Sequence, residues 1–278
     1  MRIGLIGVGN MGYPLFQRLL KQQHKVNILI DPYNPRNFQR CSLFRPEQIN
    51  QFIQESDTIF SILPRSTITK DLIAHIKDPV VQTKYWVDLC CSCPKDAKEI
   101  NLNLLKLGIE YMDAPVSGTP KNMTNGDLST IISGPITCYQ QTYDLVSSYN
   151  KNIFYISDQV GTASSVKLAN NALLAANMIS LGEVLNMLYK NDVDVDEALH
   201  FINSSSGRSW VSTHQFPKHI LDNHFDTGFS YELHKKDILT FLRSEYLEDS
   251  YILKTLVEVY NNPDHIFKDH TEIVKIIK

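Results

Sequence analysis

Residues 161–190 read GTASSVKLANNALLAANMISLGEVLNMLYK and contain no proline. A run of about thirty such residues predicts one α-helix about 45 Å long, at 1.5 Å of rise per residue. Its apolar residues fall on every side, so we expect a central helix buried on most faces. Lys167 and Asn171 are four residues apart and project from the same side. A lysine inside such a helix is costly unless it is paired or lines a cavity, which makes this side a candidate site.

The chain before this helix alternates short apolar runs with helical patterns. The runs cover residues 3–6, 26–30, 58–63, 86–89, 109–112, 130–133 and 153–156, and helical patterns at 48–54 and 95–107 lie between several of them. This alternation predicts a doubly wound, mostly parallel sheet. After Gly161 the strand signals stop, and helices follow with breaks at residues 203–207, Pro217 and Pro263. We therefore expect an α/β fold in which the long helix joins a sheet domain of residues 1–160 to an all-α domain of residues 161–278.

The first apolar run leads directly into a glycine-rich turn made of Gly7, Val8, Gly9, Asn10, Met11 and Gly12, and a helical pattern follows. In this order the first glycine permits a tight turn and the second lets a pyrophosphate approach the backbone. The third glycine lets the helix pack against the strand. The segment is therefore typical of the dinucleotide site of a Rossmann sheet, with the helix N-terminus facing the phosphates.

Asp31 ends the second apolar run, about 20 residues beyond the glycines, where the dinucleotide fingerprint places an acidic residue. A carboxylate there accepts hydrogen bonds from the adenosine ribose and repels a 2'-phosphate, which favours NAD over NADP. Two observations keep alternatives open. Asp31 could serve only to open the turn at Pro32, and Arg36 could accommodate the phosphate of NADP.

Sheets of this kind bind ligands at the carboxyl ends of their strands, so the residues that follow the apolar runs are candidate contacts. They include Leu63 and Pro64, Cys90 and Cys91, and the segment of residues 113–118. In that segment Ser117 and Gly118 offer a hydroxyl and backbone N–H groups that suit a carboxylate. The same residues also fit an ordinary loop, and the segment alone does not separate the two interpretations.

Composition limits the classes of protein that need to be considered. The net charge is -3, with 43% hydrophobic and 21% charged residues, and no basic run points to nucleic acid or an anionic membrane. The 5 cysteines include three that are crowded at residues 90–93, with no second pair of metal ligands, so we expect reduced thiols and no metal site. The N-terminus has no signal-peptide pattern, and charged residues interrupt the most apolar stretch. We expect a soluble, cytoplasmic protein that does not enter a membrane.

Taken in order, these motifs resemble the β-hydroxyacid dehydrogenase family, which includes the 3-hydroxyisobutyrate dehydrogenases. The resemblance covers essentially the whole chain and rests on five motifs: residues 7–12, Leu63-Pro64, residues 113–118, the stretch from Gly161 through Lys167 to Asn171, and Lys236-Asp237. It implies hydride transfer between NAD, or alternatively NADP, and a small β-hydroxy acid or semialdehyde. It also favours a dimer or tetramer.

The resemblance implies a role for each matching residue. Lys167 is the catalytic acid/base, and Asn171 orients the substrate. The substrate contacts are Ser117, Gly118, Thr119, Asn170, Arg208 and Lys236. The cofactor contacts are residues 7–12, Asp31, Leu63, Pro64, Cys91 and Lys236. Burial is expected to lower the pKa of Lys167 toward the working pH. Arg208 could equally be a solvated loop charge.

The chain departs from the family pattern at three places. Thr119 stands where a second glycine is usual and is expected to restrict the backbone. Cys90-Cys91 replaces a Ser-Thr pair, and Ile68 replaces an asparagine near the cofactor. These departures bear on the substrate and on cofactor affinity rather than on the reaction class.

Three other functions remain alternatives. A non-catalytic NAD-binding sensor or scaffold needs the glycine turn but not Lys167, Asn171 and Ser117 together. A decarboxylating enzyme of the 6-phosphogluconate type resembles longer chains and needs a basic phosphate site that this sequence lacks. An imine reductase is related, but that group generally has no lysine at the catalytic position.

Overall fold

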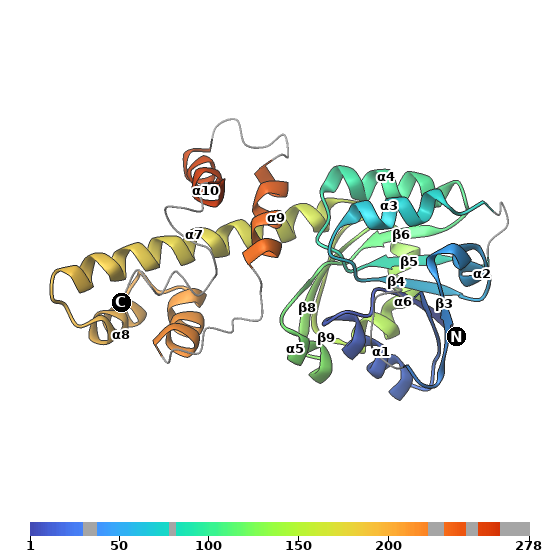
Figure 1. The fold of residues 1–278 in the computed structure, drawn as a ribbon, viewed down its shortest axis with the longest axis horizontal. Coiled ribbons are helices and arrows are strands. Elements are labelled where there is room, and N and C mark those ends of the chain that lie inside the picture. Colours follow the sequence, from blue (N-terminus) through green and yellow to red (C-terminus); the bar gives the residue numbers. More distant parts are fainter. Residues whose placement is uncertain (30–37, 78–81, 222–230, 243–249, 262–278) are drawn as a thin grey trace. The chain divides into compact units, whose positions relative to one another are not determined.

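The computed structural model describes residues 1–29, 38–77, 82–221, 231–242 and 250–261. It divides into two compact units, Met1–Lys167 and Leu168–Lys278. The boundary falls within helix α7 (Thr162–Lys190), the helix predicted from residues 161–190 (Figure 1). Each unit is described separately below.

The first unit is built around a nine-stranded sheet with the order β3-β2-β1-β4-β5-β6-β8-β7, in which β9 also pairs with β8. The strands are β1 (Arg2–Ile6), β2 (Lys25–Leu29), β3 (Cys41–Phe44), β4 (Thr58–Ser61), β5 (Tyr85–Asp88), β6 (Glu110–Asp113), β7 (Val116–Ser117), β8 (Leu128–Ser133) and β9 (Asn150–Ser157). All pairs are parallel except those of β8 with β6 and β7. The predicted doubly wound, mostly parallel sheet is confirmed.

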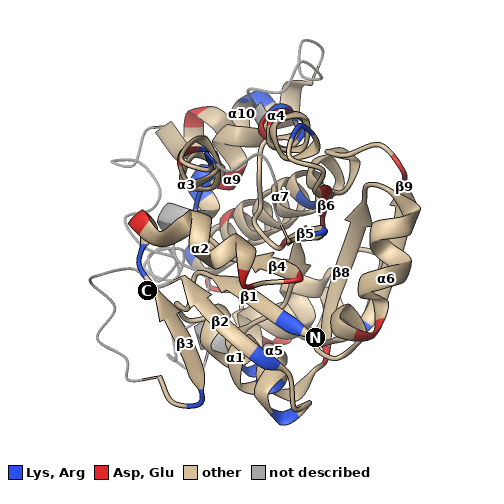
Figure 2. Cartoon of the chain, turned by 90° about the vertical axis from the view of Figure 1, so that its right-hand side faces the viewer, with Lys and Arg blue, Asp and Glu red and all other residues tan. Residues whose placement is uncertain are grey.

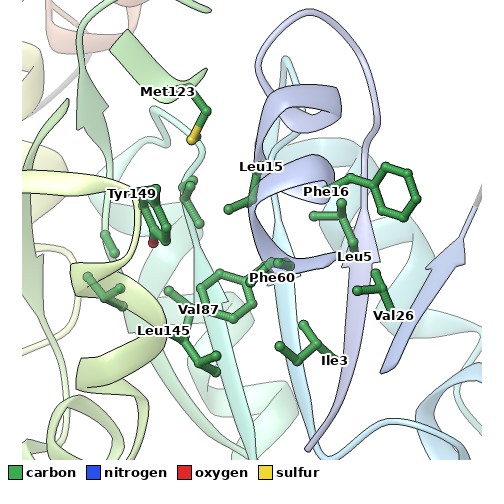
Figure 3. Packing of buried hydrophobic residues seen from close by; sticks show 14 of the residues in the cluster. Ile3, Leu5, Leu15, Phe16, Val26, Phe60, Val87, Met123, Leu145 and Tyr149 are labelled. Atoms are coloured by element: carbon green, nitrogen blue, oxygen red, sulfur yellow. The ribbon is translucent and has the colours of Figure 1, made fainter. Parts of the chain in front are cut away.

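Helices cover both faces of this sheet, and each face has its own apolar core. Helices α1 (Gly12–Lys21), α5 (Pro120–Asn125) and α6 (Ile136–Ser147) contribute to one core, whereas α2 (Ile49–Gln54), α3 (Ser66–Ala74) and α4 (Pro94–Leu105) contribute to the other. Side chains along each strand alternate between the two cores: in β4, for example, Phe60 packs on the first and Ile59 on the second. Figure 3 shows the first core, with Phe60 and Val87 of the sheet facing Leu145 and Tyr149.

Some elements of this unit lie outside the predicted runs and helical patterns. Strand β3 pairs with β2 only and buries only Phe44, so it has no continuous apolar run. Strand β7 has two residues and is too short to produce a periodic signal. Helix α3 begins at Ser66, in a stretch for which the sequence indicated no element. A 3₁₀ turn, η1 (Pro46–Gln48), precedes α2.

The second unit is helical in its described part. The C-terminal portion of α7 packs with α8 (Val195–Ser204), η2 (Val211–Leu221), α9 (Tyr231–Leu242) and α10 (Tyr251–Asn261) around a core that includes Leu185, Phe216 and Ile238. A break predicted at Pro217 is wrong, because this proline lies inside η2. The helix has π geometry there, which accommodates the missing N–H by widening the turn rather than by ending it. Pro263 lies outside the described residues.

Helix α7 is less buried than its composition suggests. Leu173 is 62% exposed, Met187 is 55% exposed, and Val184 and Tyr189 are also exposed. The prediction that this helix is buried on most faces is therefore wrong for the single chain. In the second unit, helices α8 to α10 cover one side of α7. By length and composition α7 could also cross a membrane, a test that the core helix of a soluble protein passes as well.

Candidate active site

The glycine turn between β1 and α1 has the geometry that a dinucleotide requires. Gly7 has a φ of 91°, and a Cβ at this residue would clash with the carbonyl oxygen of Ile62. A Cβ at Gly12 would clash with the carbonyl oxygen of Gly7, so the helix packs directly on the turn. Nothing lies within 4 Å of the Cβ position at Gly9, which is exposed together with Asn10. The backbone is thus open at the residue where a pyrophosphate would approach.

The next two strands bring the predicted cofactor contacts to the same edge of the sheet. Strands β1, β4 and β5 are parallel neighbours, and Leu63 and Cys91 follow the ends of β4 and β5. The backbone N–H of Leu63 donates to the Cys90 Sγ at 3.1 Å, so the loops after β4 and β5 are joined. Cys91 and Leu63 are half-buried, and Pro64 is exposed. Ile68, one of the three expected departures from the family pattern, is 37% exposed on α3.

A buried carboxylate lies beneath these loops. Asp88 Oδ1 accepts hydrogen bonds from Ser61 Oγ at 2.8 Å and from the backbone N–H of Cys90 at 3.1 Å. Asp88 Oδ2 accepts one from the Tyr111 hydroxyl at 2.9 Å. Burial raises the pKa of the Asp88 carboxyl, while hydrogen bonds from Cys90, Ser61 and Tyr111 act in the opposite direction. Burial and the neighbouring Asp88 charge raise the pKa of Tyr111 well above its ordinary value, so the phenol keeps its proton.

The predicted carboxylate turn lies between β7 and α5. Ser117 and Gly118 are exposed, and Ser117 pairs with Ser129 of β8. Thr119 has a φ of -101° and a ψ of 170°, an extended conformation open to any residue. The expected restriction at Thr119 is therefore wrong, because the position does not require glycine. Thr119 is the N-cap of α5, because its hydroxyl oxygen accepts from the backbone N–H of Asn122 at 3.4 Å. The backbone N–H and hydroxyl of Thr119 in turn donate to Asn122 Oδ1, at 2.8 and 2.7 Å.

Lys167 belongs to the first unit and lies in the second turn of α7. Its side chain is half-buried rather than enclosed. Asn170 and Asn171 follow within one turn of the same helix. Asn170 is exposed, and its Nδ2 donates to Asn171 Oδ1 at 3.3 Å.

In the second unit, α7 and α9 bring two predicted residues together through a third. Asn171 is buried, and its Nδ2 donates to Asp237 Oδ2 at 2.8 Å. Lys236 Nζ lies 2.9 Å from Asp237 Oδ1. Asp237 therefore fixes both Asn171 and Lys236, a role that was not predicted although the residue belongs to one of the five motifs. The sequence feature that could have indicated this role is the acidic residue directly after Lys236.

A buried histidine supports the same step of α7. His234 Nε2 lies 3.1 Å from the carbonyl oxygen of Asn171, and His234 Nδ1 lies 3.2 Å from the Tyr260 hydroxyl of α10. His234 has no exposed surface. No periodic or motif signal indicates this contact in the sequence, because its three residues come from three separate helices.

Among the described residues, Arg208 lies apart from these networks. Arg208 is exposed in the turn between α8 and η2, where its backbone N–H donates to the Ser205 carbonyl oxygen. Asp31, with Arg36, lies outside the described residues. Among the described residues, charges of both signs are interspersed over the face shown in Figure 2.

A doubly wound sheet, an open glycine turn at its carboxyl edge and a following helical unit define the class of Rossmann-type, dinucleotide-binding oxidoreductases. Family models match both parts of the chain. Residues 2–157 match the NAD binding domain of 6-phosphogluconate dehydrogenase, and residues 161–247 match the model described as NAD-binding of NADP-dependent 3-hydroxyisobutyrate dehydrogenase. The chain belongs to the β-hydroxyacid dehydrogenase family and is an NAD(P)-dependent dehydrogenase.

Relatives of known activity are similar over most of the chain. The 2-(hydroxymethyl)glutarate dehydrogenase of Eubacterium barkeri is 28% identical over 247 residues, which cover 86% of this chain and 80% of the relative. The mitochondrial 3-hydroxyisobutyrate dehydrogenase of Rattus norvegicus is 28% identical over 247 residues, 85% of this chain and 73% of the relative. The chain thus spans most of the length of both enzymes.

Solved structures show the same fold. A Mycobacterium tuberculosis 3-hydroxyisobutyrate dehydrogenase studied with L-serine has a TM-score of 0.82 at 20% identity, covering 99% of this chain and 97% of that one. An imine reductase variant from Myxococcus stipitatus in complex with NAD+ has a TM-score of 0.69 at 15% identity, covering 100% and 99%. At these identities the likeness defines the fold and does not separate the two activities.

Proposed function

We propose that the protein transfers a hydride between NAD and a small β-hydroxy acid, or its semialdehyde, with Lys167 as the general acid/base. The observation that carries the proposal lies within the first unit. One sheet presents the open glycine turn and the exposed Ser117 turn, and the helix that follows the sheet carries Lys167. The names of the relatives support a hydroxy-acid substrate. Residues 1–160 would hold NAD, and residues 161–278 would complete the substrate site and the oligomer interface.

The nicotinamide supplies the hydride chemistry, which leaves the protein to position the substrate and move one proton. During oxidation, neutral Lys167 accepts the proton of the substrate hydroxyl as that oxygen becomes a carbonyl. During reduction, the protonated ammonium returns it. Asn171 orients the same oxygen, and Asp237 holds the Asn171 amide in place. The Ser117 hydroxyl and the Gly118 and Thr119 region receive the substrate carboxylate, with Asn170, Arg208 and Lys236 as further contacts.

The residues at the glycine turn fit a dinucleotide. The open position at Gly9 and the close packing of Gly12 on Gly7 leave room for phosphates at the N-terminus of α1, where no acidic residue occupies the first turn. Leu63, Pro64 and Cys91 line the following loops. We propose NAD rather than NADP on the basis of the acidic residue at position 31, and the assay below includes both.

The decisive test is Lys167→Ala, assayed for NADH and NADPH formation with 3-hydroxyisobutyrate, 3-hydroxypropionate, glycerate, serine and threonate. These acids represent our proposed substrate range of about three to five carbons. We expect kcat to fall at least about 100-fold while NADH still binds, because the variant loses general acid–base catalysis. The matched control is Lys190→Ala, which removes an exposed lysine from the last turn of the same helix.

Each outcome separates the competing functions. Turnover of wild type and control but not of Lys167→Ala supports the proposal. Near-normal turnover of Lys167→Ala contradicts it. Binding of NAD without turnover of any acid favours a sensor, whereas turnover of a cyclic imine with NADPH in place of the acids favours an imine reductase.

We also propose that the protein works as a dimer or tetramer in the cytoplasm, without nucleic acid or membrane partners. The exposed apolar side chains of α7, including Leu173 and Met187, support an interface between copies of the chain. Sedimentation velocity of the purified protein tests the assembly, and a monomer at micromolar concentration would contradict it.

A further inference from the structure

The start of α7 is held by one buried side chain from the sheet. Asp113, the last residue of β6, is 1% exposed and accepts hydrogen bonds at both carboxylate oxygens. Its Oδ2 accepts from the backbone N–H of Ser164 at 2.8 Å and from the Ser164 hydroxyl at 2.7 Å. Its Oδ1 accepts from the backbone N–H of Gly161 at 3.0 Å and from the Ser133 hydroxyl at 2.5 Å.

These contacts satisfy donors that a helix leaves without partners. The first N–H groups of an α-helix have no intrahelical acceptor. Here Gly161 and Ser164 donate to Asp113, and the N–H of Ala163 donates to Ser133 Oγ at 2.9 Å. Asp113 therefore caps α7 from a strand remote in sequence, and its negative charge suits the positive end of the helix dipole. This cap fixes the first turns of α7, which belong to the first unit, against the end of β6.

Strand β8 holds the segment that leads from Asp113 to the predicted carboxylate turn. Asp113 pairs with Ser133 at one end of β8, whereas Ser117 pairs with Ser129 at the other. Between them the Thr130 hydroxyl lies 3.1 Å from the carbonyl oxygen of Ala114. The segment of residues 113–117 is thus bound along β8, and its first residue holds the helix.

Lys167 lies three residues beyond Ser164, about 4.5 Å farther along the helix axis at 1.5 Å per residue. A shift of the capped turn is transmitted directly to Lys167, because a helix turns as a rigid unit over this length. We infer that Asp113 is a positioning residue for the reaction: it sets Lys167 relative to the Ser117–Gly118 turn. This inference rests on the proposed role of Lys167.

The test is a double-mutant cycle in the full-length protein, made of Asp113→Asn, Lys167→Ala and the double variant. An asparagine has one acceptor oxygen, so its amide would face the N–H of either Gly161 or Ser164 and move the helix start. We expect kcat to fall about 10- to 100-fold in Asp113→Asn, the scale of a misplaced catalytic group, with the Kd of NADH changed less than about twofold. In the Lys167→Ala background the same substitution is expected to lower kcat by less than about twofold, because the group it positions is gone.

An equal loss of kcat in both backgrounds would overturn the inference and leave the role of Lys167 standing. Full turnover of Lys167→Ala would instead remove the proposed function itself. Ser164→Ala covers the case in which Asp113→Asn fails to fold, since it deletes one hydroxyl and keeps the backbone bond. It is expected to lower kcat about two- to fivefold when Lys167 is present and not at all in the Lys167→Ala background, and equal losses there would likewise overturn the inference.

Discussion

Asp88 and Asp113 occupy equivalent positions on neighbouring strands and do different work. They are register partners at the ends of β5 and β6, and both are almost completely buried. Asp88 binds within the sheet and its loops, to Ser61, Cys90 and Tyr111. Asp113 binds the start of α7. One carboxylate thus stabilises the cofactor side of the sheet edge, and the other stabilises the helix on the proposed catalytic side.

The difference lies in the donors. At Asp88 one oxygen accepts from a backbone N–H and a serine hydroxyl, and the other accepts from the Tyr111 hydroxyl, which can accept as well as donate. At Asp113 each oxygen faces a backbone N–H, which cannot reverse its direction. An asparagine therefore keeps the backbone hydrogen bond at position 88 but loses one of the two backbone hydrogen bonds at position 113. Two carboxylates that look alike in burial and register differ in how strictly a second acceptor oxygen is required.

The largest expected effect is a loss of cofactor affinity with the fold unchanged. Gly9→Ala places a methyl group where nothing in the protein lies within 4 Å, so the fold has room for it and only the dinucleotide would meet it. We expect NADH to bind about 30-fold more weakly, while Tm stays within about 1 °C of wild type. NADH fluorescence titration and thermal unfolding measure the two quantities.

Gly207→Ala is the matched control, since its added methyl makes only an ordinary contact at 3.4 Å with Ile202 in the helical unit. It should leave NADH affinity unchanged. Unaltered NADH binding in Gly9→Ala would show that the phosphates do not approach this turn.

The second effect compares the two carboxylates directly. Asp113→Asn leaves a buried backbone donor without an acceptor, which costs about 1–3 kcal/mol of unfolding free energy. Asp88→Asn should cost about 1 kcal/mol, at the lower end of that range, because every backbone donor keeps its acceptor and only the Tyr111 hydroxyl proton loses one. Urea unfolding of both variants measures the difference, and equal losses would show that burial rather than donor type decides.

The sequence specifies the sheet better than it specifies these polar centres. The glycine turn was predictable because its three glycines follow one another at a fixed spacing in a short stretch of sequence, and the structure shows why Gly7 and Gly12 have no room for a side chain. Lys167 and Asn171 could be placed together because one helix turn separates them. The apolar runs located seven of the nine strands, since buried parallel strands leave continuous hydrophobic signals.

The polar centres combine residues far apart in the chain. Asp113 and Ser164 are 51 positions apart, and Asn171 and Asp237 are 66 apart. No periodicity links such residues, so only the fold shows that Asp113 caps α7 or that Asp237 orients Asn171. The exposed apolar side of α7 was missed for a related reason: composition shows how apolar a helix is but not how many neighbours one chain supplies to cover it.

A smaller effect on stability is expected at Thr119, whose hydrogen-bond partner Asn122 is only three residues away. Thr119→Ala removes the hydroxyl that caps α5 but keeps the backbone bond to Asn122. Loss of an N-cap side chain costs about 1 kcal/mol, so unfolding free energy should fall by that amount with NADH affinity unchanged. Thr119→Ser keeps the hydroxyl and should restore most of the loss. No difference between Ala and Ser would show that the hydroxyl does not stabilise the turn.

The smallest effect comes from an aspartate at the opposite end of the same sheet. Asp57 precedes β4 and accepts three hydrogen bonds from Arg2, one from its backbone N–H at 2.9 Å and two from its guanidinium. Partial burial acts to raise the pKa of Asp57, but the bonds from Arg2 outweigh it and hold the pKa below its ordinary value. A carboxyl with a lowered pKa in the folded state contributes stability above the unfolded pKa of about 4, and this contribution is lost as the pH falls through the folded value.

Asp57→Asn should therefore lower Tm at pH 7 by less than about 3 °C, the scale of a solvent-exposed ion pair. The gap between wild type and variant should narrow as the pH falls below about 4, because the wild-type carboxyl is then protonated as well. Thermal unfolding from about pH 7 to about pH 2 at constant ionic strength measures it, a range that spans the carboxyl titration. A gap that stays constant over this range would mean that the Asp57 charge contributes nothing and that only the hydrogen bonds of the side chain matter. Asp57 would then differ from Asp113 in exposure, but both carboxylates would stabilise the fold through the hydrogen bonds that they accept.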